Sequence, residues 1–248
     1  MSAVNPAHSA AARAPEYEPF IRLYVWDVWV RLCHWIIAFS ILILSVTGVY
    51  IGDPYLIVPG QAGQHFVMGW MKVIHFYAAI AFTLAVLARV LWMLVGPRRA
   101  GWRELIPVEK ERLVGIFLTI QFYLWGRDTP PRSPGHNPLA GATYIAVFAL
   151  YFVMITTGLG LYALSAHVDS PLRIFDFLAY WWGGPMFARW VHHIVMWLLI
   201  GFFVHHVFSA LLISAVKKNG TMESIFSGFK WVHPDEAKRE AERWARRK

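Results

Sequence analysis

The sequence predicts an all-α integral membrane protein built as a bundle of four membrane-spanning helices. Of its 248 residues, 57% are hydrophobic, 16% are aromatic and only 15% are charged. A soluble domain needs more charge than this to cover its surface. Four apolar stretches are long enough to cross about 30 Å of hydrocarbon, which takes about twenty residues. The expected spans are about 31–51, 67–95, 140–164 and 189–216, separated by segments rich in glycine and proline.

The segments outside these spans are assigned from their length and charge. A fifth apolar run, residues 113–125, is too short to span, so we expect a short interfacial helix in the cytoplasmic loop. The four-helix membrane domain is expected over residues 25–229, after a flexible N-terminal segment, residues 1–24. Residues 230–248 form a charged cytoplasmic tail, and their alternating acids and bases suit either a solvated helix or disorder.

The basic residues predict the orientation in the membrane. They gather between the second and third spans and after the fourth, whereas the loop between the first and second spans has none. Because basic loops stay in the cytoplasm, both termini are expected there. The net charge of +8 fits contact with anionic lipid headgroups. Nucleic-acid binding is a poor interpretation of this charge, since the basic residues follow the ends of the spans.

Histidines within the expected spans are the candidates for function, because an ionisable side chain is costly inside a membrane and usually functional. His192 and His206 are fourteen residues apart (206 − 192 = 14). On an α-helix this spacing returns the side chain to within about 40° of the same face, about 21 Å further along. The neighbouring His193 and His205 do not share that face with them.

Depth in the membrane arranges four histidines as two pairs. His34 lies near the cytoplasmic start of the first span, and His75 lies near the outer start of the second. The fourth span enters from outside, so His192 is expected to meet His75, and His206 to meet His34. Neutral imidazole binds iron well, and iron with two histidine ligands has no open position, which suits electron transfer. We therefore predict two b-type haems about 20 Å apart.

Other interpretations of these residues stay open. A membrane histidine can bond a carbonyl or a hydroxyl instead, and a zinc site would need ligands that converge on one point. The stretches 47–48 (Thr-Gly) and 157–160 (Thr-Gly-Leu-Gly) suit either a close porphyrin edge or helix packing. His193 and His205 are expected to face another helix, a haem propionate or water. His136 has two possible roles. It either acts near the quinone or a haem propionate, or it makes a hydrogen bond within its loop.

Five stretches of the sequence resemble the cytochrome b subunit of membrane-bound respiratory NiFe hydrogenases. They are residues 30–35, 46–52, 71–76, 135–140 and 192–207. The similarity runs from Tyr24 to about Phe229 and extends to the cytochrome b subunits of formate dehydrogenases and the bacterial b561 group. The Gly-His-Asn-Pro stretch at residues 135–138 is the most specific to the hydrogenase branch. Cys33 departs from the family, since relatives often have an aromatic residue there.

The resemblance implies a function and a location. A subunit of this kind lies in the bacterial inner membrane and anchors the small iron–sulfur and large subunits of a periplasmic hydrogenase. It carries electrons from H2 oxidation to quinone through an outer haem b on His75 and His192 and an inner haem b on His34 and His206. H2 cleavage itself is not expected in this chain, because a single cysteine, Cys33, excludes an iron–sulfur cluster. The alternatives are a subunit of another periplasmic dehydrogenase, such as formate dehydrogenase, and a haem-free structural anchor.

Overall fold

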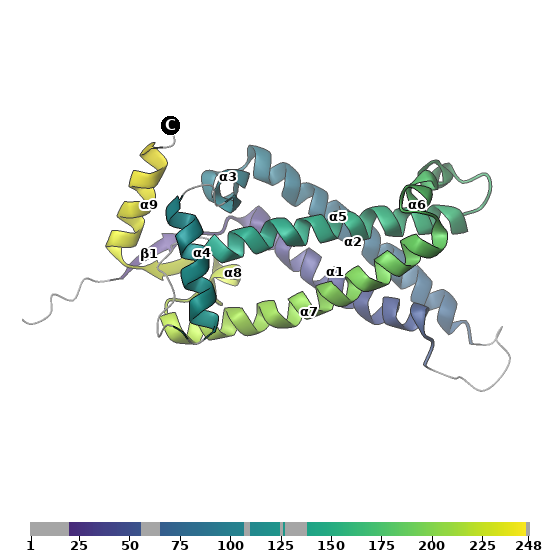
Figure 1. Ribbon diagram of the computed structural model, residues 1–248, viewed down its shortest axis with the longest axis horizontal. Helices are drawn as coiled ribbons and strands as arrows, with labels where there is room; N and C mark the ends of the chain where they lie inside the picture. Colours follow the sequence, from purple (N-terminus) through teal and green to yellow (C-terminus); the bar gives the residue numbers. More distant parts are fainter. Residues whose placement is uncertain (1–19, 56–64, 107–109, 125, 127–137, 247–248) are drawn as a thin grey trace, which may run out of the picture.

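Four long helices form an elongated bundle in the computed structural model, which describes residues 20–55, 65–106, 110–124, 126 and 138–246. They are α1 (Val28–Gly52), α2 (Val67–Val95), α5 (Pro138–Ser165) and α7 (Pro185–Lys217), and they run along the long axis of the molecule (Figure 1). All four are long and apolar enough to cross a membrane. The predicted four-helix membrane architecture is therefore confirmed.

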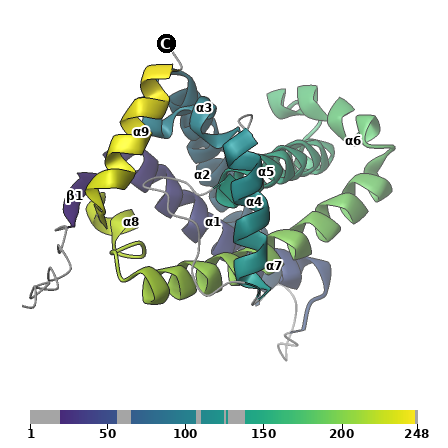
Figure 2. The ribbon, with the colours of Figure 1, turned by 60° about the vertical axis from the view of Figure 1, so that its left-hand side comes forward.

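The long helices associate as two close pairs. Helix α1 packs mainly on α2, and α5 packs mainly on α7. Helices α5 and α7 lie together near the short helices η2 (Pro171–Phe175) and α6 (Phe177–Trp181), and they separate toward the opposite end (Figures 1 and 2). We call these two ends of the bundle the α6 end and the α9 end, after the short helix that lies at each.

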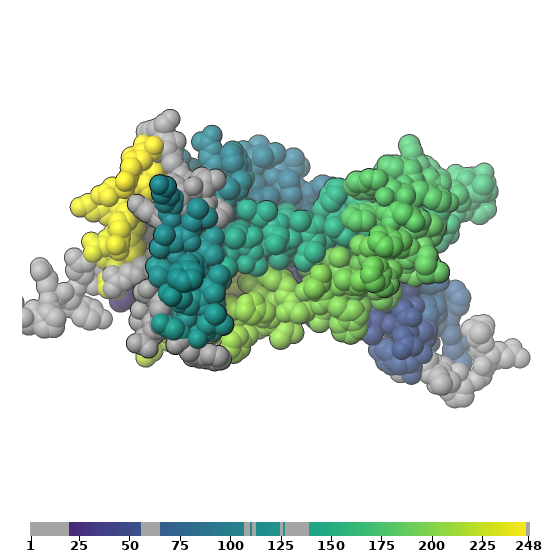
Figure 3. All heavy atoms as spheres, viewed as in Figure 1, coloured from purple at the N-terminus to yellow at the C-terminus, as the bar shows by residue number. Residues whose placement is uncertain are grey.

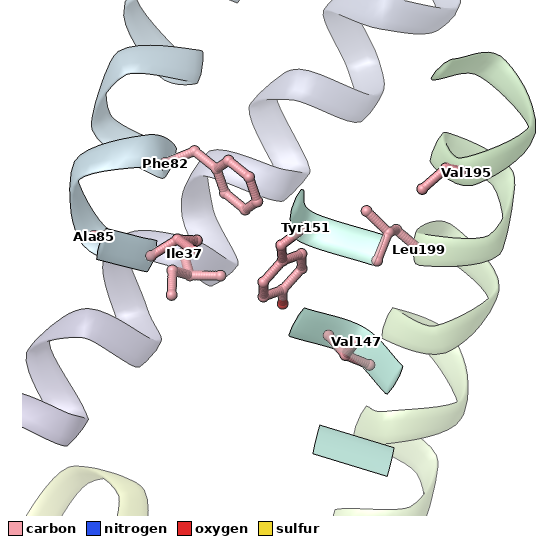
Figure 4. Close-up of a cluster of buried hydrophobic side chains, with 8 residues drawn as sticks. Ile37, Phe82, Ala85, Val147, Tyr151, Val195 and Leu199 are labelled. Carbon is pink, nitrogen blue, oxygen red and sulfur yellow. The ribbon is translucent and has the colours of Figure 1, made fainter. Parts of the chain in front are cut away.

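An apolar cluster fills the centre of the bundle and draws on all four long helices. Its members are Ile37, Phe82, Ala85, Val86, Val147, Tyr151, Val195 and Leu199. Figure 4 shows seven of them pointing toward one another, and the rings of Phe82 and Tyr151 meet edge to face at 5.1 Å. In lipid, close packing of this kind holds helices together. Because Val195 and Leu199 lie between His192 and His206 on α7, the cluster separates the two halves of the bundle.

The starts of two long helices have a clear local cause. Asp27 is the N-cap of α1 and accepts the Val30 N–H at 3.0 Å. The same carboxylate accepts the Trp92 Nε1–H at 3.1 Å, which ties the start of α1 to the end of α2. Helix α7 begins at Pro185, a residue favoured in the first turn. The preceding Gly184 has a φ of 104°, which glycine adopts without a side-chain clash.

The expected short helix is present as α4 (Lys110–Tyr123). It crosses the bundle at a steep angle to α5 and α7 at the α9 end (Figure 1). Thr119 and Phe122 are buried against the bundle, whereas Leu113 and Phe117 are exposed. One buried face and one exposed apolar face on a helix set across the spans are the features of a helix at a membrane surface.

The two ends of the described chain meet in a small sheet, which differs from the expected organisation. Strand β1 (Ile21–Tyr24) pairs antiparallel with β2 (Phe229–Val232), with Ile21 opposite Val232 and Tyr24 opposite Phe229. We expected a flexible segment over residues 1–24 and a charged tail over residues 230–248 that is either a solvated helix or disordered. Main-chain hydrogen bonds between the two segments instead order both of them, over the part of residues 1–24 that the structure describes.

The C-terminal helix α9 (Pro234–Arg246) is docked on the bundle rather than free in solvent. Glu240 is buried and pairs with Arg99. Glu104, in the short helix α3 (Trp102–Leu105), accepts hydrogen bonds from Arg243 and from Trp244 Nε1, the latter at 2.8 Å. The space-filling view shows α4 and α9 gathered at the same end (Figure 3). Charged residues of this segment thus form the ion pairs that hold α9 against η1 (Arg98–Ala100) and α3.

Candidate functional site

His75 on α2 is held by a threonine on the neighbouring helix α1. Its Nδ1 lies 2.8 Å from Thr47 Oγ1, which lies 2.7 Å from the carbonyl oxygen of Ile43 one turn earlier. A carbonyl oxygen only accepts, so the hydroxyl donates to Ile43 and accepts the Nδ1–H of His75. This network assigns the ring proton to Nδ1. The other nitrogen, Nε2, is then free to bind a metal.

The same arrangement recurs between α5 and α7. Thr157 Oγ1 lies 2.8 Å from His192 Nδ1 and 2.6 Å from the carbonyl oxygen of Val153. Thr157 is fully buried, and Thr47 is only 4% exposed, so neither hydroxyl is available to solvent. His75 and His192 lie close enough to interact electrostatically. Both imidazoles of this α6-end pair are therefore held in one tautomer by a buried hydroxyl.

A glycine follows each of these threonines and lies against the same ring. A Cβ placed on Gly158 would lie 3.1 Å from His192 Cε1, and one on Gly48 would lie 3.4 Å from His75 Cε1. Gly160 has another role, because its Cβ would lie 2.6 Å from the backbone nitrogen of Ala179 in α6. We expected these small residues to admit a porphyrin edge or to pack helices. In the structure Gly158 makes room for an imidazole, a Cβ on Gly48 would lie closest to Met196 Sδ at 3.3 Å, and Gly160 packs helices.

His34 on α1 and His206 on α7 meet at the α9 end. Their ring centroids are 6.2 Å apart, and their planes are inclined by 52°. Two imidazoles that bind one metal from opposite sides, with metal–nitrogen bonds of about 2 Å, have centroids about 6 Å apart. His34 Nδ1 is buried and has no hydrogen-bond partner among the described residues. Unlike the Nδ1 atoms of His75 and His192, this ring nitrogen is not held by a threonine of the described chain.

The two neighbouring histidines face other helices. The ring of His193 packs on the end of α1, because its Nε2 lies against the position that a Cβ on Gly52 would take. His205 contacts Tyr123 of α4, with ring centroids 6.1 Å apart, and its Nε2 lies 3.3 Å from Ser209 Oγ. Both rings thus contact another helix, and each also lies near a polar atom of α7 itself, Arg189 O for His193 and Ser209 Oγ for His205. His136 lies outside the described residues.

Arg89 on α2 is a buried cation that the sequence reasoning missed. It is 2% exposed, and its NH1 donates to the carbonyl oxygen of Ala100 at 3.2 Å. The guanidinium lies 5.4 Å from the ring centroid of Tyr144 and interacts electrostatically with Cys33, the residue before His34. A lone arginine within an expected span was the available signal, since an intramembrane charge is functional by default.

Paired imidazoles in opposite halves of a four-helix membrane bundle define the class of this protein as a membrane cytochrome. Residues 25–228 match the family model described as prokaryotic cytochrome b561. The chain belongs to this family, and membership implies b-type haem. Two features of the structure fit such a group: the centroid spacing of 6.2 Å between His34 and His206, and the close approach of His192 to Gly158.

Curated relatives match most of the chain. The Probable Ni/Fe-hydrogenase B-type cytochrome subunit of Bradyrhizobium diazoefficiens is 33% identical over 209 residues, which cover 83% of this chain and 85% of the relative. The Probable Ni/Fe-hydrogenase 1 B-type cytochrome subunit of Escherichia coli K12 is 33% identical over 211 residues, 84% and 90% of the two chains. A relative of the same name as the first, from Cupriavidus necator, is 31% identical over 210 residues. The resemblance found in the sequence is confirmed.

Proposed function

We propose that this chain is the di-haem b-type cytochrome that anchors a periplasmic NiFe hydrogenase to the bacterial inner membrane and transfers electrons from H2 oxidation to quinone. One observation carries the proposal: two pairs of histidines lie in opposite halves of a membrane bundle. The names of relatives that match most of the chain support the hydrogenase as partner. The large and small subunits cleave H2, because one cysteine cannot ligate the clusters that reaction needs.

Four imidazoles hold the two haems in this proposal. His75 and His192 bind the outer one, and His34 and His206 bind the inner one. Each haem supplies reversible one-electron chemistry when it is bound. Two histidines per iron leave no open position, so the site transfers electrons and does not bind oxygen. The apolar cluster between the two pairs keeps water out of the middle of the bundle.

The orientation follows from the distribution of charge. The α9 end carries β1, β2, α3 and α9, and with them the first and last described residues and the basic side chains of Arg98, Arg99 and Arg243, so we place it in the cytoplasm. The α6 end then faces the periplasm and receives electrons from the small subunit. Electrons cross the bilayer within this chain, from the half that holds His75 and His192 to the half that holds His34 and His206, and leave to quinone from the inner half.

The test is to purify the chain with its partners in mild detergent and to identify the attached proteins. We expect hydrogenase subunits, two haems b for each chain, and a reduced-minus-oxidised α band that appears on adding H2. A colourless preparation would reject the cytochrome assignment and favour a haem-free anchor. Attached formate dehydrogenase subunits, with haem reduced by formate and not by H2, would assign the chain to that enzyme instead.

A further inference from the structure

We propose that Thr47 and Thr157 are positioning residues that lower the reduction potential of the outer haem by accepting hydrogen bonds from both of its histidine ligands. The proposal deepens the function proposed above and rests on it, since it takes His75 and His192 as ligands. The structural basis is one hydroxyl on α1 and one on α5, each buried against the Nδ1 of an imidazole from the partner helix.

The backbone contact of each threonine makes its hydroxyl an obligatory acceptor. A hydroxyl has one proton, and Thr47 uses it on Ile43 while Thr157 uses it on Val153, at 2.7 and 2.6 Å. Only lone pairs are left to face the rings. Each imidazole must therefore point its Nδ1–H at the threonine, which leaves the Nε2 lone pair on the side of the ring away from Nδ1.

A hydrogen bond from Nδ1–H makes the opposite nitrogen a stronger base and fixes the orientation of the ring. A more basic ligand stabilises the oxidised iron more than the reduced iron. Because both axial ligands of the outer haem carry this bond, its reduction potential is lowered from both sides. The buried position of the two hydroxyls strengthens the effect, since no water competes for the Nδ1 protons.

Within the described part of the chain, neither histidine of the inner pair donates a hydrogen bond to a threonine hydroxyl. His34 Nδ1 has no hydrogen-bond partner there, and His206 is stacked on Phe202, with ring centroids 5.5 Å apart. The threonine contacts thus act on one half of the bundle only. A lower potential in the outer half makes electron transfer toward the inner half downhill, which is the direction that H2 oxidation requires.

The chain offers a matched control next to one of these residues. Thr156 is also buried on α5, and its hydroxyl donates to the carbonyl oxygen of Phe152 at 2.8 Å. Its lone pairs accept the Trp182 Nε1–H at 3.1 Å instead of a histidine. Replacing Thr156 by valine removes a hydroxyl of the same kind from the same helix without touching the Nδ1 of His192.

The experiment compares Thr47→Val, Thr157→Val and the double variant in the purified complex with its partner subunits. Optical redox titration resolves the two haems, and low-spin EPR reports the relative orientation of the two imidazole planes. We expect a positive shift of the outer midpoint potential in each single variant, a larger shift in the double variant, and haem binding weakened by about 10- to 100-fold. The inner potential should not move. Thr47→Ser and Thr157→Ser should restore the outer potential, and Thr156→Val should leave it unchanged.

Several results would overturn the proposal. The proposal fails if Thr47→Val and Thr157→Val both keep the wild-type midpoint potential of the outer haem and the wild-type EPR signal. It also fails if the serine variants shift this potential as far as the valine variants do. If a valine variant does not accumulate, the alanine variant, which suits a helix better, takes its place under the same criteria. A wild-type complex without two haem transitions would instead reject the proposed function, so the two failures are distinguishable.

Discussion

The two halves of the bundle hold their histidines by different means. In the outer half, His75 and His192 each donate to a buried threonine of a neighbouring helix and lie against a glycine. In the inner half, the ring centroids of His34 and His206 are 6.2 Å apart, and Phe202 stacks on His206. The buried Arg89 lies on α2 in the same half and contacts the ring of Tyr144. One chain thus places histidines in two different environments, and under the proposed function these would favour opposite redox states of iron. This difference gives the proposed electron path a direction.

The largest expected effect separates the two halves directly. His192→Ala should remove the outer haem and His206→Ala the inner one, because each deletes one of two axial ligands. Haem content per chain should fall by about half in each variant, and redox titration should show which transition is lost. H2-to-quinone turnover should disappear, while H2 oxidation with a soluble dye should continue in the catalytic subunits. Full haem content in either variant would contradict the assignment.

A smaller effect on retention of the outer haem is expected from replacing Gly158 or Gly48 by alanine. The added Cβ of Gly158→Ala would lie 3.1 Å from His192 Cε1, and that of Gly48→Ala would lie 3.4 Å from His75 Cε1. Each ring is already held by its threonine and has little room to move. We expect Gly158→Ala to weaken retention of the outer haem by about tenfold and Gly48→Ala by less.

The control for this prediction is Gly201→Ala on α7, where a Cβ would meet nothing within 4 Å. Haem retention is measured by the absorbance that remains after washing in detergent. Equal losses in all three variants would mean that helix packing, and not the contact with the imidazole, decides haem retention. Loss of the inner haem would mean that the two halves are not independent.

The third prediction concerns the buried Arg89 and its effect on the reduction potential of the inner haem. A positive charge favours reduced iron, so Arg89→Gln should lower the inner potential. For a separation of the order of 10 Å and an effective dielectric constant of about 20, Coulomb's law gives about 1.7 kcal/mol, or about 70 mV for one electron. Redox titration of the purified complex checks this. A larger shift of the outer potential than of the inner one would show that Arg89 does not act on the inner half.

The last prediction concerns the sheet of β1 and β2 at the α9 end, away from the four histidines. Burial, helped by the nearby charge of Lys217 and opposed by that of Glu236, lowers the pKa of Lys230 on β2 to about 8. Its usual pKa is 10.5, so the unfolded chain holds more protons between these two values and stability rises with pH across that window. Below about pH 8 the ammonium is buried at full cost. Lys230→Met should therefore stabilise the sheet at pH 7 by up to about 3 kcal/mol and remove the rise.

Amide hydrogen exchange of β2 between pH 7 and 10, corrected for the intrinsic exchange rate, measures this effect. The outer haem spectrum serves as the internal control, because it should be the same in both proteins at every pH. A Lys230→Met variant whose β2 exchanges faster at pH 7 would contradict the prediction.

Much of the fold could be predicted from the sequence. The second span was expected at 67–95 and is the helix Val67–Val95. Helix α1 begins three residues before the expected span (31 − 28 = 3) and α7 begins four residues before (189 − 185 = 4). The added residues, 28–30 and 185–188, are themselves mostly apolar and lie before Arg31 and Arg189, where the expected spans were started. Helix ends are the least certain part of such a prediction. The assignment of the four histidines to haem stays a prediction, which haem counting decides.

The contacts that distinguish the two halves could not be predicted. Thr47 and Thr157 stood out in the sequence only as members of small-residue stretches, and nothing there showed that each meets an imidazole. The docking of α9 was missed for the same reason, since Glu104 and Arg243 are 139 positions apart. The sequence shows that Arg89 is a charge within a span, but it does not show that Arg89 contacts Ala100 and Tyr144.

The sequence by itself determined the number of spans, the depth of each histidine and the helix face that His192 shares with His206. These follow from local composition and from the fixed rise and turn of an α-helix, which need no knowledge of neighbours. Only the tertiary structure decided which hydroxyl meets which imidazole, because Thr47 and His75 come from different helices, 28 positions apart. A hydrogen bond needs its two atoms within about 3 Å, and the packing of helices sets that distance.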